Sequence, residues 1–321
     1  MRIAVTGAGG FLGLNLVRRL AADGHDVLAI DRAFSQRSAA AIPADVRSIG
    51  ADILDGGTIE SAFRAFRPDA LFHGATLTAS VARERSSFAD VVNVNVVGAA
   101  RVLGAAHAAG AGRIVVASSS AVYGESVFNV APTEVDVPSP VTLYGITKLA
   151  AEQAALRFGV IHGSDVRVAR IAAVFGAYEH RSGARDAMSP LFQLAAKALA
   201  GEAADLPEGG ARDWIAASRV ASVIAALLTA SRLEHQIYNV AASRTWEPPL
   251  LARALAHAFP GWVWSTDDHP NVDYADDLSR RRFALDTRWL RAEFGDEVVG
   301  DPDADVAAYV EWLRDNPDWF R

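Results

Sequence analysis

Short apolar runs alternate with longer stretches of helical spacing in the first half of the chain. Residues 3–5 are continuously apolar, as expected of a strand that is covered on both faces. Leucines recur every four residues through 11–22, which predicts a helix. The same pattern predicts strands at 27–30, 46–49, 70–72, 113–117 and 166–171, and helices at 87–109 and 142–158. This alternation predicts a parallel sheet with helices on both faces.

The pattern becomes less regular after Gly176. Residues 178–187 are polar and rich in arginine, and we predict a loop there. Helices are predicted at 191–200 and 216–230, and a strand at 237–240. The chain therefore combines a large α/β sheet with a smaller C-terminal cap.

The composition excludes several classes of protein. The chain has 321 residues, a net charge of -7 and no cysteine. Without cysteine there is no disulfide scaffold and no thiolate nucleophile, and the spacing of the histidines indicates no metal site. The acidic balance argues against nucleic acid as a partner, because phosphate binding needs a basic face. No stretch resembles a signal peptide or a membrane span of about 20 apolar residues, so we expect a cytoplasmic protein without a membrane segment.

A glycine-rich turn follows the first predicted strand. Gly7, Gly10 and Gly13 are spaced three residues apart, and Phe11 and Leu12 begin the following helix. The first glycine permits a tight turn, the second lets the backbone approach a pyrophosphate, and the third lets the helix pack closely on the strand. The amino-terminus of the helix directs free N–H groups at the phosphates. The motif therefore predicts a dinucleotide site.

Two acidic positions specify this site further. Asp31 closes the second predicted strand, where a carboxylate accepts hydrogen bonds from an adenosine ribose and repels a 2′-phosphate. Arg32 follows directly and would tolerate that phosphate, so NADP stays as an alternative to the expected NAD. Asp52 and Ile53 follow the third predicted strand and are placed to flank the adenine ring.

These observations give the predicted fold: an α/β protein with a Rossmann-type, doubly wound parallel sheet and a smaller C-terminal α/β cap that binds substrate. We predict that residues 1–175 form the NAD-binding domain and that 213–242 return to it. Residues 176–212 and 243–321 are expected to form the cap.

A second group of residues carries acid–base chemistry. Tyr144 and Lys148 stand four residues apart and share one face of a predicted helix. A nearby cation favours the phenolate and lowers the pKa of a tyrosine, which then removes a hydroxyl proton while hydride leaves for the cofactor. Ser118, Ser119 and Ser120 follow the strand predicted at 113–117, at the sheet edge where ligands bind, and a serine there can hydrogen-bond the reacting oxygen.

The order of these motifs resembles the extended short-chain dehydrogenase/reductases, and specifically the NAD-dependent epimerase/dehydratase family. The resemblance covers nearly the whole chain, through the glycine turn, Ser118–Gly124, Tyr144-x-x-x-Lys148, and the later segments Arg212–Ile215 and Leu285–Thr287. It implies that Tyr144 is the base, that Lys148 holds the nicotinamide ribose and lowers the pKa of that tyrosine, and that Ser119 polarises the substrate oxygen. It also implies further cofactor contacts or supports at Gly74, Ala75 and Asn95, and substrate contacts at Thr76, Ser120, Tyr123, Arg181, Arg185 and Arg212.

The chain departs from the family pattern in the substrate region. Related dehydratases place an Asp-Glu pair after the catalytic serine, whereas this chain has Ser120-Ala121. Ala173 replaces an asparagine, and Ala177 a proline, that nucleotide-sugar enzymes usually carry. The first departure argues against a dehydratase, and the others leave a smaller polyhydroxylated or carboxylated substrate open.

We therefore predict NAD-dependent hydride transfer at a secondary alcohol or ketone of a carbohydrate-like substrate, as in sugar or nucleotide-sugar epimerases. A net dehydrogenase or reductase acting on a small hydroxy acid, sugar acid or other alcohol is the alternative. A third possibility is an NAD-sensing protein without catalysis. By analogy with relatives, a homodimer is expected to pair the helices at 87–109 and 142–158.

Overall fold

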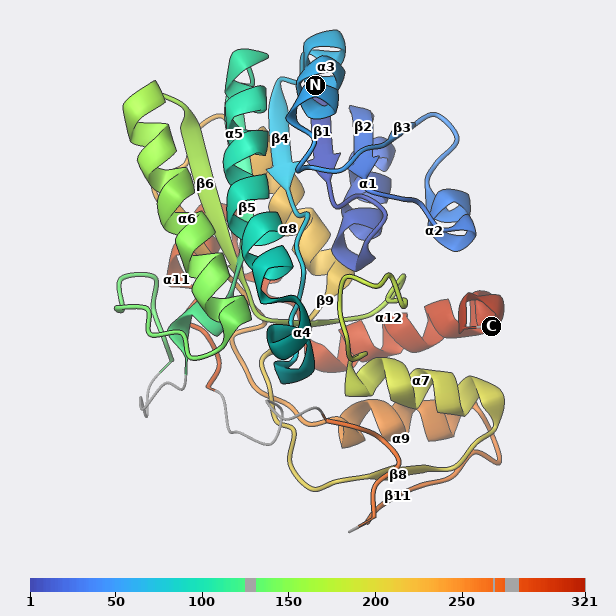
Figure 1. Ribbon diagram of the computed structural model, residues 1–321. Helices are drawn as coiled ribbons and strands as arrows, with labels where there is room; N and C mark the ends of the chain where they lie inside the picture. Colours follow the sequence, from blue (N-terminus) through green and yellow to red (C-terminus); the bar gives the residue numbers. More distant parts are fainter. Residues whose placement is uncertain (125–130, 268, 275–282, 321) are drawn as a thin grey trace.

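A seven-stranded parallel sheet forms the centre of the computed structural model, which describes residues 1–124, 131–267, 269–274 and 283–320. The strands lie in the order β10-β6-β5-β4-β1-β2-β3 (Figure 1). Their direction of progression reverses between β1 and β4, which opens a crevice at the carboxyl ends of the strands. The predicted fold class is confirmed. The strands are β1 (Arg2–Thr6), β2 (Asp26–Asp31), β3 (Arg47–Gly50), β4 (Ala70–His73), β5 (Arg113–Ser119), β6 (Asp165–Ile171) and β10 (Ile237–Val240).

Helices cover both faces of the sheet, and each face has its own apolar core (Figure 1). Leucines and valines of the first and eighth helices interlock on one face, and phenylalanines of the third helix are buried on the other. Each such fully buried side chain contributes roughly 1.5–3 kcal/mol. The first face carries α1 (Phe11–Ala22), α8 (Ala217–Thr229) and α11 (Arg288–Phe294), and the second carries α3 (Gly56–Phe66), α5 (Ala99–Ala108) and α6 (Leu143–His162).

The helix predicted to begin at Ser87 begins instead at Val81. Ser80 caps it, because its hydroxyl accepts the backbone N–H of Arg83. Ser87 has non-helical backbone angles (φ -144, ψ 36) and kinks the helix, so the apolar periodicity resumes only after it. The stretch comprises α4 (Val81–Val92), the π-helical η1 (Asn93–Gly98) and α5.

The stretch Val81–Ala108 is the one helix among the described residues that is long and apolar enough, by length and composition, to cross a membrane. In the structure its second half packs between α3 and α6 in the helical layer on the sheet.

The cap lies beyond the carboxyl ends of the strands (Figure 1) and has a separate core. Trp214 and Trp246 are buried in it, and the ring of Phe175 packs edge-on against Trp246. The boundaries of the two domains stay a prediction, although β10 pairs with β6 and so joins the main sheet. The cap contains α7 (Pro190–Ala200), α9 (Pro249–Ala258) and α12 (Pro302–Asp315), with the strand pair β8 (Ala204–Leu206) and β11 (Trp264–Thr266). A further strand pair, β7 (Ala173–Phe175) and β9 (Trp214–Ala216), contributes side chains to the core of the cap.

The remaining elements are short. They are α2 (Gln36–Ala41), η2 (Ser120–Tyr123), η3 (Asp296–Val298) and η4 (Pro317–Phe320).

Candidate active site

A cleft of about 1010 Å³ runs between the carboxyl edge of the sheet and the cap. Ligand pockets commonly measure about 300–1,000 Å³, so the cleft has room for a large ligand. Of the predicted site residues, Asn95 alone is not part of its lining. The others line it: Gly7, Gly10, Phe11, Leu12, Gly13, Asp31, Arg32, Asp52, Ile53, Gly74, Ala75, Thr76, Ser119, Ser120, Tyr123, Tyr144, Lys148, Arg181, Arg185 and Arg212.

The glycine turn is too tightly packed for larger residues. Gly7 has a positive φ of 73°, and a Cβ atom added to it would lie 2.7 Å from the backbone nitrogen of Ala75. A Cβ atom on Gly13 would lie 2.0 Å from the carbonyl oxygen of Gly7. Helix α1 starts directly after this turn, and no side chain caps it at Gly10. Its first N–H groups are therefore free to bind an anionic group such as a pyrophosphate.

Asp31 is held beside this turn. Its Oδ2 atom accepts the N–H of Gly9 at 2.9 Å. Burial raises the pKa of the Asp31 carboxyl, while the N–H of Gly9 and the charge of Arg32 lower it. Ile53 is buried, and a Cβ atom on Gly98 would lie 2.5 Å from its Cδ1 atom. These contacts fix one carboxylate and one apolar side chain at the end of the cleft where an adenosine would lie.

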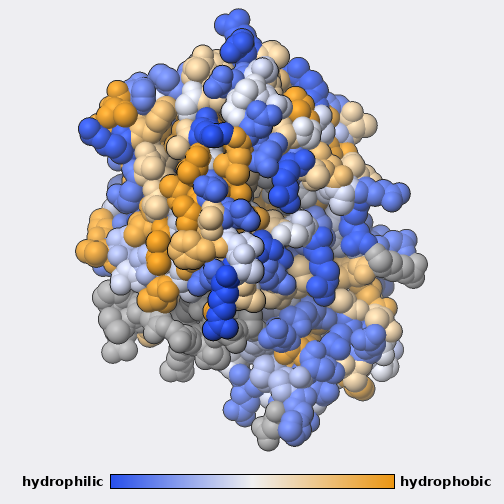
Figure 2. Space-filling model, in the orientation of Figure 1, coloured by the Kyte–Doolittle hydropathy of each residue, from blue (hydrophilic) through white to orange (hydrophobic). Residues whose placement is uncertain are grey.

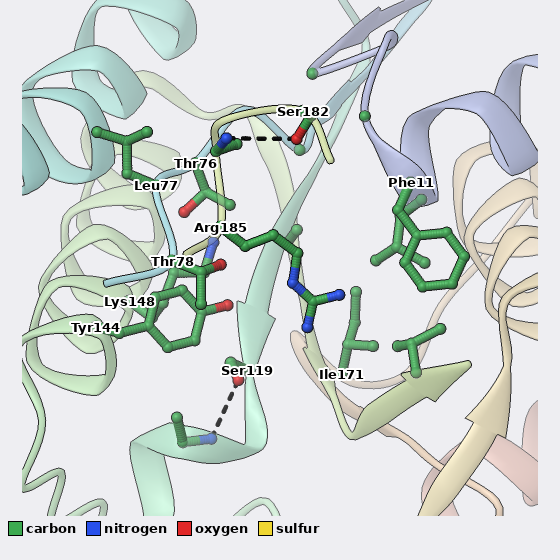
Figure 3. A pocket seen from close by; sticks show the side chains of 18 of the residues that line it. Phe11, Thr76, Leu77, Thr78, Ser119, Tyr144, Lys148, Ile171, Ser182 and Arg185 are labelled. Atoms are coloured by element: carbon green, nitrogen blue, oxygen red, sulfur yellow. Dashed lines mark hydrogen bonds between the residues drawn. The ribbon is translucent and has the colours of Figure 1, made fainter. Parts of the chain in front are cut away.

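Tyr144 and Ser119 approach each other because Gly145 lets helix α6 pack closely against η2. Thr142 caps α6 by accepting the N–H of Gly145, which places Tyr144 in the first turn. A Cβ atom on Gly145 would lie 2.6 Å from the carbonyl oxygen of Ala121, so a larger residue would push α6 away from η2. Figure 3 shows the hydroxyl groups of Tyr144, Thr78 and Ser119 facing a common space. Gly145 and Thr78 are thus part of the site geometry alongside the predicted catalytic residues.

The surroundings shift the pKa values of both Tyr144 and Lys148. Burial raises the pKa of Tyr144, and three groups oppose it: the Ser119 hydroxyl as a hydrogen-bond partner, the charge of Arg185, and the Thr78 hydroxyl. Burial lowers the pKa of Lys148 to about 8, although Glu152 raises it. The charge of Arg185 therefore opposes the effect of burial on the pKa of Tyr144, and the same role for Lys148 stays a prediction.

A buried charge pair lies beneath Lys148. Glu152 follows it by one helical turn, is fully buried, and accepts hydrogen bonds from Arg170 at 2.6 Å and from Ser118 at 2.8 Å. This pair ties α6 to the ends of β5 and β6. His73 is also buried nearby, and burial lowers its pKa to about 3, with a smaller effect from Lys148, so the imidazole is neutral.

Asn95 supports the cleft from behind. Its Oδ1 atom accepts the N–H of Leu77 at 2.8 Å and the hydroxyl of Thr76 at 3.0 Å. Its Nδ2 atom donates to the carbonyl of Leu77 and to the hydroxyl of Thr147 on α6. Asn95 lies in the π-helical turn η1, and such turns are frequent at functional sites. It thus joins the segment after β4 to the helix that carries Tyr144.

The residues predicted to contact substrate differ in their surroundings. The hydroxyl of Tyr123 donates to Asn239 at 2.7 Å and accepts from Arg170 at 2.9 Å, within a buried network. Arg212 is buried, and its backbone pairs with Trp246. Arg181 is exposed on the loop after β7, whereas Arg185 on the same loop forms an ion pair with the buried Glu179. The sequence pattern offered no signal for that carboxylate.

Within residues 1–124, 131–267, 269–274 and 283–320, no group of three or more histidine, aspartate or glutamate side chains is arranged to hold a metal ion.

Comparison with known proteins gives the family. Residues 3–241 match the NAD dependent epimerase/dehydratase family. A dTDP-glucose 4,6-dehydratase of Streptomyces niveus is 29% identical over 336 residues, which cover 100% of this chain and 95% of that relative. A UDP-glucose 4-epimerase of Corynebacterium glutamicum is 30% identical over 255 residues, or 75% of each chain.

Solved structures agree. The UDP-glucose 4-epimerase of Thermus thermophilus, in complex with NAD, matches with a TM-score of 0.81 and 26% identity, over 98% of this chain and 99% of that one. The predictions of an enzyme and of NAD as its cofactor are confirmed at the level of the family. The chain belongs to the NAD dependent epimerase/dehydratase family.

Proposed function

We propose that this protein catalyses reversible, NAD-dependent oxidation at a secondary alcohol of a carbohydrate-like substrate, as an epimerase. One observation carries the proposal: Tyr144, Ser119 and Lys148 line the same cleft as the glycine turn and Asp31. That arrangement brings a proton acceptor, a hydrogen-bonding hydroxyl and a cation to the place where a nicotinamide ring would end.

NAD fits the residues present. The turn at Gly7–Gly13 and the uncapped start of α1 would hold the pyrophosphate, and Asp31 would hold the adenosine ribose. Asp52 and Ile53 would flank the adenine, and Lys148 would bind the nicotinamide ribose. When bound, NAD supplies a positively charged ring that accepts a hydride from the substrate carbon.

The chain's own residues manage the proton. Tyr144 takes the proton of the substrate hydroxyl, and Ser119 hydrogen-bonds the same oxygen and orients it. Burial raises the pKa of Tyr144 in the protein alone, so positive charge at the cleft is needed to bring the phenol into use near neutral pH. Arg185 supplies part of that charge, and the nicotinamide ring would add to it.

Epimerisation is favoured over dehydration by the residues after Ser119. Ser120 and Ala121 form the start of η2 and offer no carboxylate for elimination. The named relatives include both a dehydratase and an epimerase, so similarity does not choose between the two reactions, and the choice made here rests on these two residues. A net dehydrogenase remains the second candidate, because its first half-reaction uses the same three residues.

The test compares wild type with Tyr144→Phe during turnover of nucleotide sugars and of free sugars. We expect a loss of about 10²–10⁴-fold in activity, the usual contribution of a positioned acid or base, with NAD still bound. Tyr274→Phe is the matched control, because its hydroxyl is buried and lies outside the cleft lining. Full activity in Tyr144→Phe would contradict the mechanism. Net accumulation of NADH, measured by its absorbance, would show that the protein acts as a dehydrogenase rather than as an epimerase.

We also propose a homodimer that pairs α4 and α5 with α6. Several apolar side chains on α4, η1 and α6 face solvent in the single chain. Figure 2 shows apolar residues in several groups among hydrophilic ones on the side of the molecule where α5 and α6 lie in Figure 1. Exposed apolar patches of this kind mark association surfaces. The exposed side chains are Phe88, Val97, Ile146, Val160 and Ile161. A cytoplasmic location stays a prediction.

A further inference from the structure

We propose that Arg185 recognises a carboxylate on the substrate, next to the carbon that is oxidised, so that the enzyme acts on sugar acids. The inference rests on the proposed function, because it assumes that the reacting hydroxyl is bound by Tyr144 and Ser119.

The loop that carries Arg185 is fixed to the opposite wall of the cleft. The backbones of Thr78 and Arg185 form an isolated parallel β-bridge, and the N–H of Thr78 donates to the carbonyl of Ala184 at 2.8 Å. Arg83 donates to the carbonyl of Gly183 at 2.9 Å and forms an ion pair with Asp186. Arg185 is therefore a placed residue rather than a solvated loop charge.

A buried carboxylate orients the guanidinium group. Glu179 is 1% exposed and accepts a hydrogen bond from Nη1 of Arg185 at 2.9 Å. Its other donors are the N–H and hydroxyl of Ser189, at 3.1 Å and 2.7 Å. Ser189 is the N-cap residue of α7, so Glu179 is held at the amino-terminus of a helix in the C-terminal cap. Burial raises the pKa of Glu179 while Arg185 lowers it, which is consistent with a carboxylate that depends on this partner.

Most of the guanidinium group's hydrogen-bonding capacity is not used by the protein. Glu179 is the sole hydrogen-bond partner of Arg185 among the described residues, and only Nη1 makes that bond. A guanidinium group has five N–H donors in a planar fork. Figure 3 shows the rest of the fork extending into the open cleft, between Tyr144 and Ile171. The side chain is 31% exposed there, so a ligand can reach it.

The position of the fork defines the chemistry that it can recognise. Figure 3 shows the guanidinium group of Arg185 on the cleft side of the Tyr144 ring, and its charge lowers the pKa of that phenol. A ligand group paired with Arg185 would therefore sit beside the oxygen that Tyr144 deprotonates. A carboxylate matches the planar fork with two parallel hydrogen bonds. A neutral hydroxymethyl group at that point could accept from only one of the N–H donors that Glu179 leaves unused, which disfavours neutral sugars.

The experiment uses matched pairs of substrates with the NAD-loaded protein: UDP-glucuronic acid with UDP-glucose, and free glucuronic acid with free glucose. A sugar phosphate serves as a third anion. We expect kcat/KM for the acid to exceed that for its neutral partner by about 100-fold or more, as sites built for a polar group discriminate strongly. Arg185→Gln should lower the ratio of kcat/KM for the acid to kcat/KM for its neutral partner by about 100-fold. A smaller loss shared by both substrates is expected, because Arg185 also lowers the pKa of Tyr144.

Two further variants serve as controls: one keeps the positive charge at position 185, and one removes an arginine elsewhere. Arg185→Lys keeps the charge but loses the fork, so it should retain an intermediate preference for the acid. Arg85→Gln removes an exposed arginine of α4 that does not line the cleft, and it should match wild type. The unfolding temperature and NAD affinity of each variant report whether it is folded.

Failure of this inference can be told apart from failure of the proposed function. Binding of the same pairs to the NAD-loaded Tyr144→Phe protein, measured by calorimetry, does not require turnover. Equal affinity for acid and neutral sugar, preference for the phosphate, or an equal loss for both sugars in Arg185→Gln would overturn carboxylate recognition. Turnover of neutral sugars alone would leave the proposed reaction intact and refute the role of Arg185. Tight binding of the acid without turnover would support the role of Arg185 and refute the proposed reaction.

Discussion

Gly13→Ala is the sharpest test of the glycine turn, because the collision can be stated atom by atom. The added Cβ atom would lie 2.0 Å from the carbonyl oxygen of Gly7, and 2.7 Å and 2.8 Å from the Cα and carbonyl carbon of Ala8. All three are backbone atoms, which cannot rotate out of the way. Recovering an ordinary separation of about 3.5 Å requires the turn and α1 to move apart by about 1 Å or more.

The movement has two measurable consequences. Overpacking of this kind costs about 1–3 kcal/mol, which should lower the melting temperature of a chain of 321 residues by about 1.5–5 °C. The displaced N–H groups of α1 should reduce NAD affinity by about 10–100-fold, where tenfold corresponds to about 1.4 kcal/mol. Thermal unfolding and calorimetric titration with NAD measure the two effects on the same preparation.

Gly104→Ala is the matched control, since Gly104 is also helical and its added Cβ atom would meet nothing within 4 Å. It should stabilise the protein by about 0.5–1 kcal/mol and leave NAD affinity unchanged. If Gly13→Ala bound NAD within about threefold of wild type and melted at the same temperature, the turn would tolerate a side chain and the phosphate cradle would be wrong.

Three further predictions concern charge and association. Asp31→Asn keeps an acceptor for Gly9 but removes the charge, so the ratio of NAD to NADP affinity should fall by about tenfold or more in competitive titration. Burial raises the pKa of Asp213 to about 7. Between about pH 4 and 7 the folded protein therefore keeps a proton on Asp213 that the unfolded chain has released. The free energy of unfolding should fall as the pH rises through this range and level off above about pH 7. Chemical denaturation of wild type and Asp213→Asn across this range should show that difference in slope, and parallel curves would contradict it. Ile161→Glu should give a monomer in sedimentation, whereas Val137→Glu, at an exposed apolar residue outside these helices, should not.

Strands β1, β2, β4 and β5 of the main sheet contain continuous apolar runs, so they are predictable without long-range information. Helix α3 was not predicted: it begins with Gly56 and Gly57, which are poor helix formers, and Asp55 offsets this by capping the N–H of Thr58. The start of α4 was misplaced because the kink at Ser87 interrupts the apolar spacing.

The candidate site divides in the same way. The glycine turn and the Tyr144–Lys148 spacing are local, so the sequence predicts them directly. The pairing of Arg185 with Glu179 arises within an irregular loop whose path is set by contacts with the segment after β4 and with α7. No periodicity describes such a loop, and its chemistry emerges only when those elements are assembled.

Helix α6 reverses the usual distribution of side chains, and this reversal connects the proposals. Its buried face carries Lys148 and Glu152, while Ile146 and Ile161 face solvent. Burying two charged groups gives up apolar contacts that a helix of this length would otherwise make, and the ion pair of Glu152 with Arg170 offsets that loss only in part. Local rules are broken in this way where function requires it. The buried charges hold Tyr144 at the cleft, and the exposed apolar residues are best explained by a second copy of the chain. The proposed homodimer would therefore cover apolar residues of the same helix that carries the proposed base.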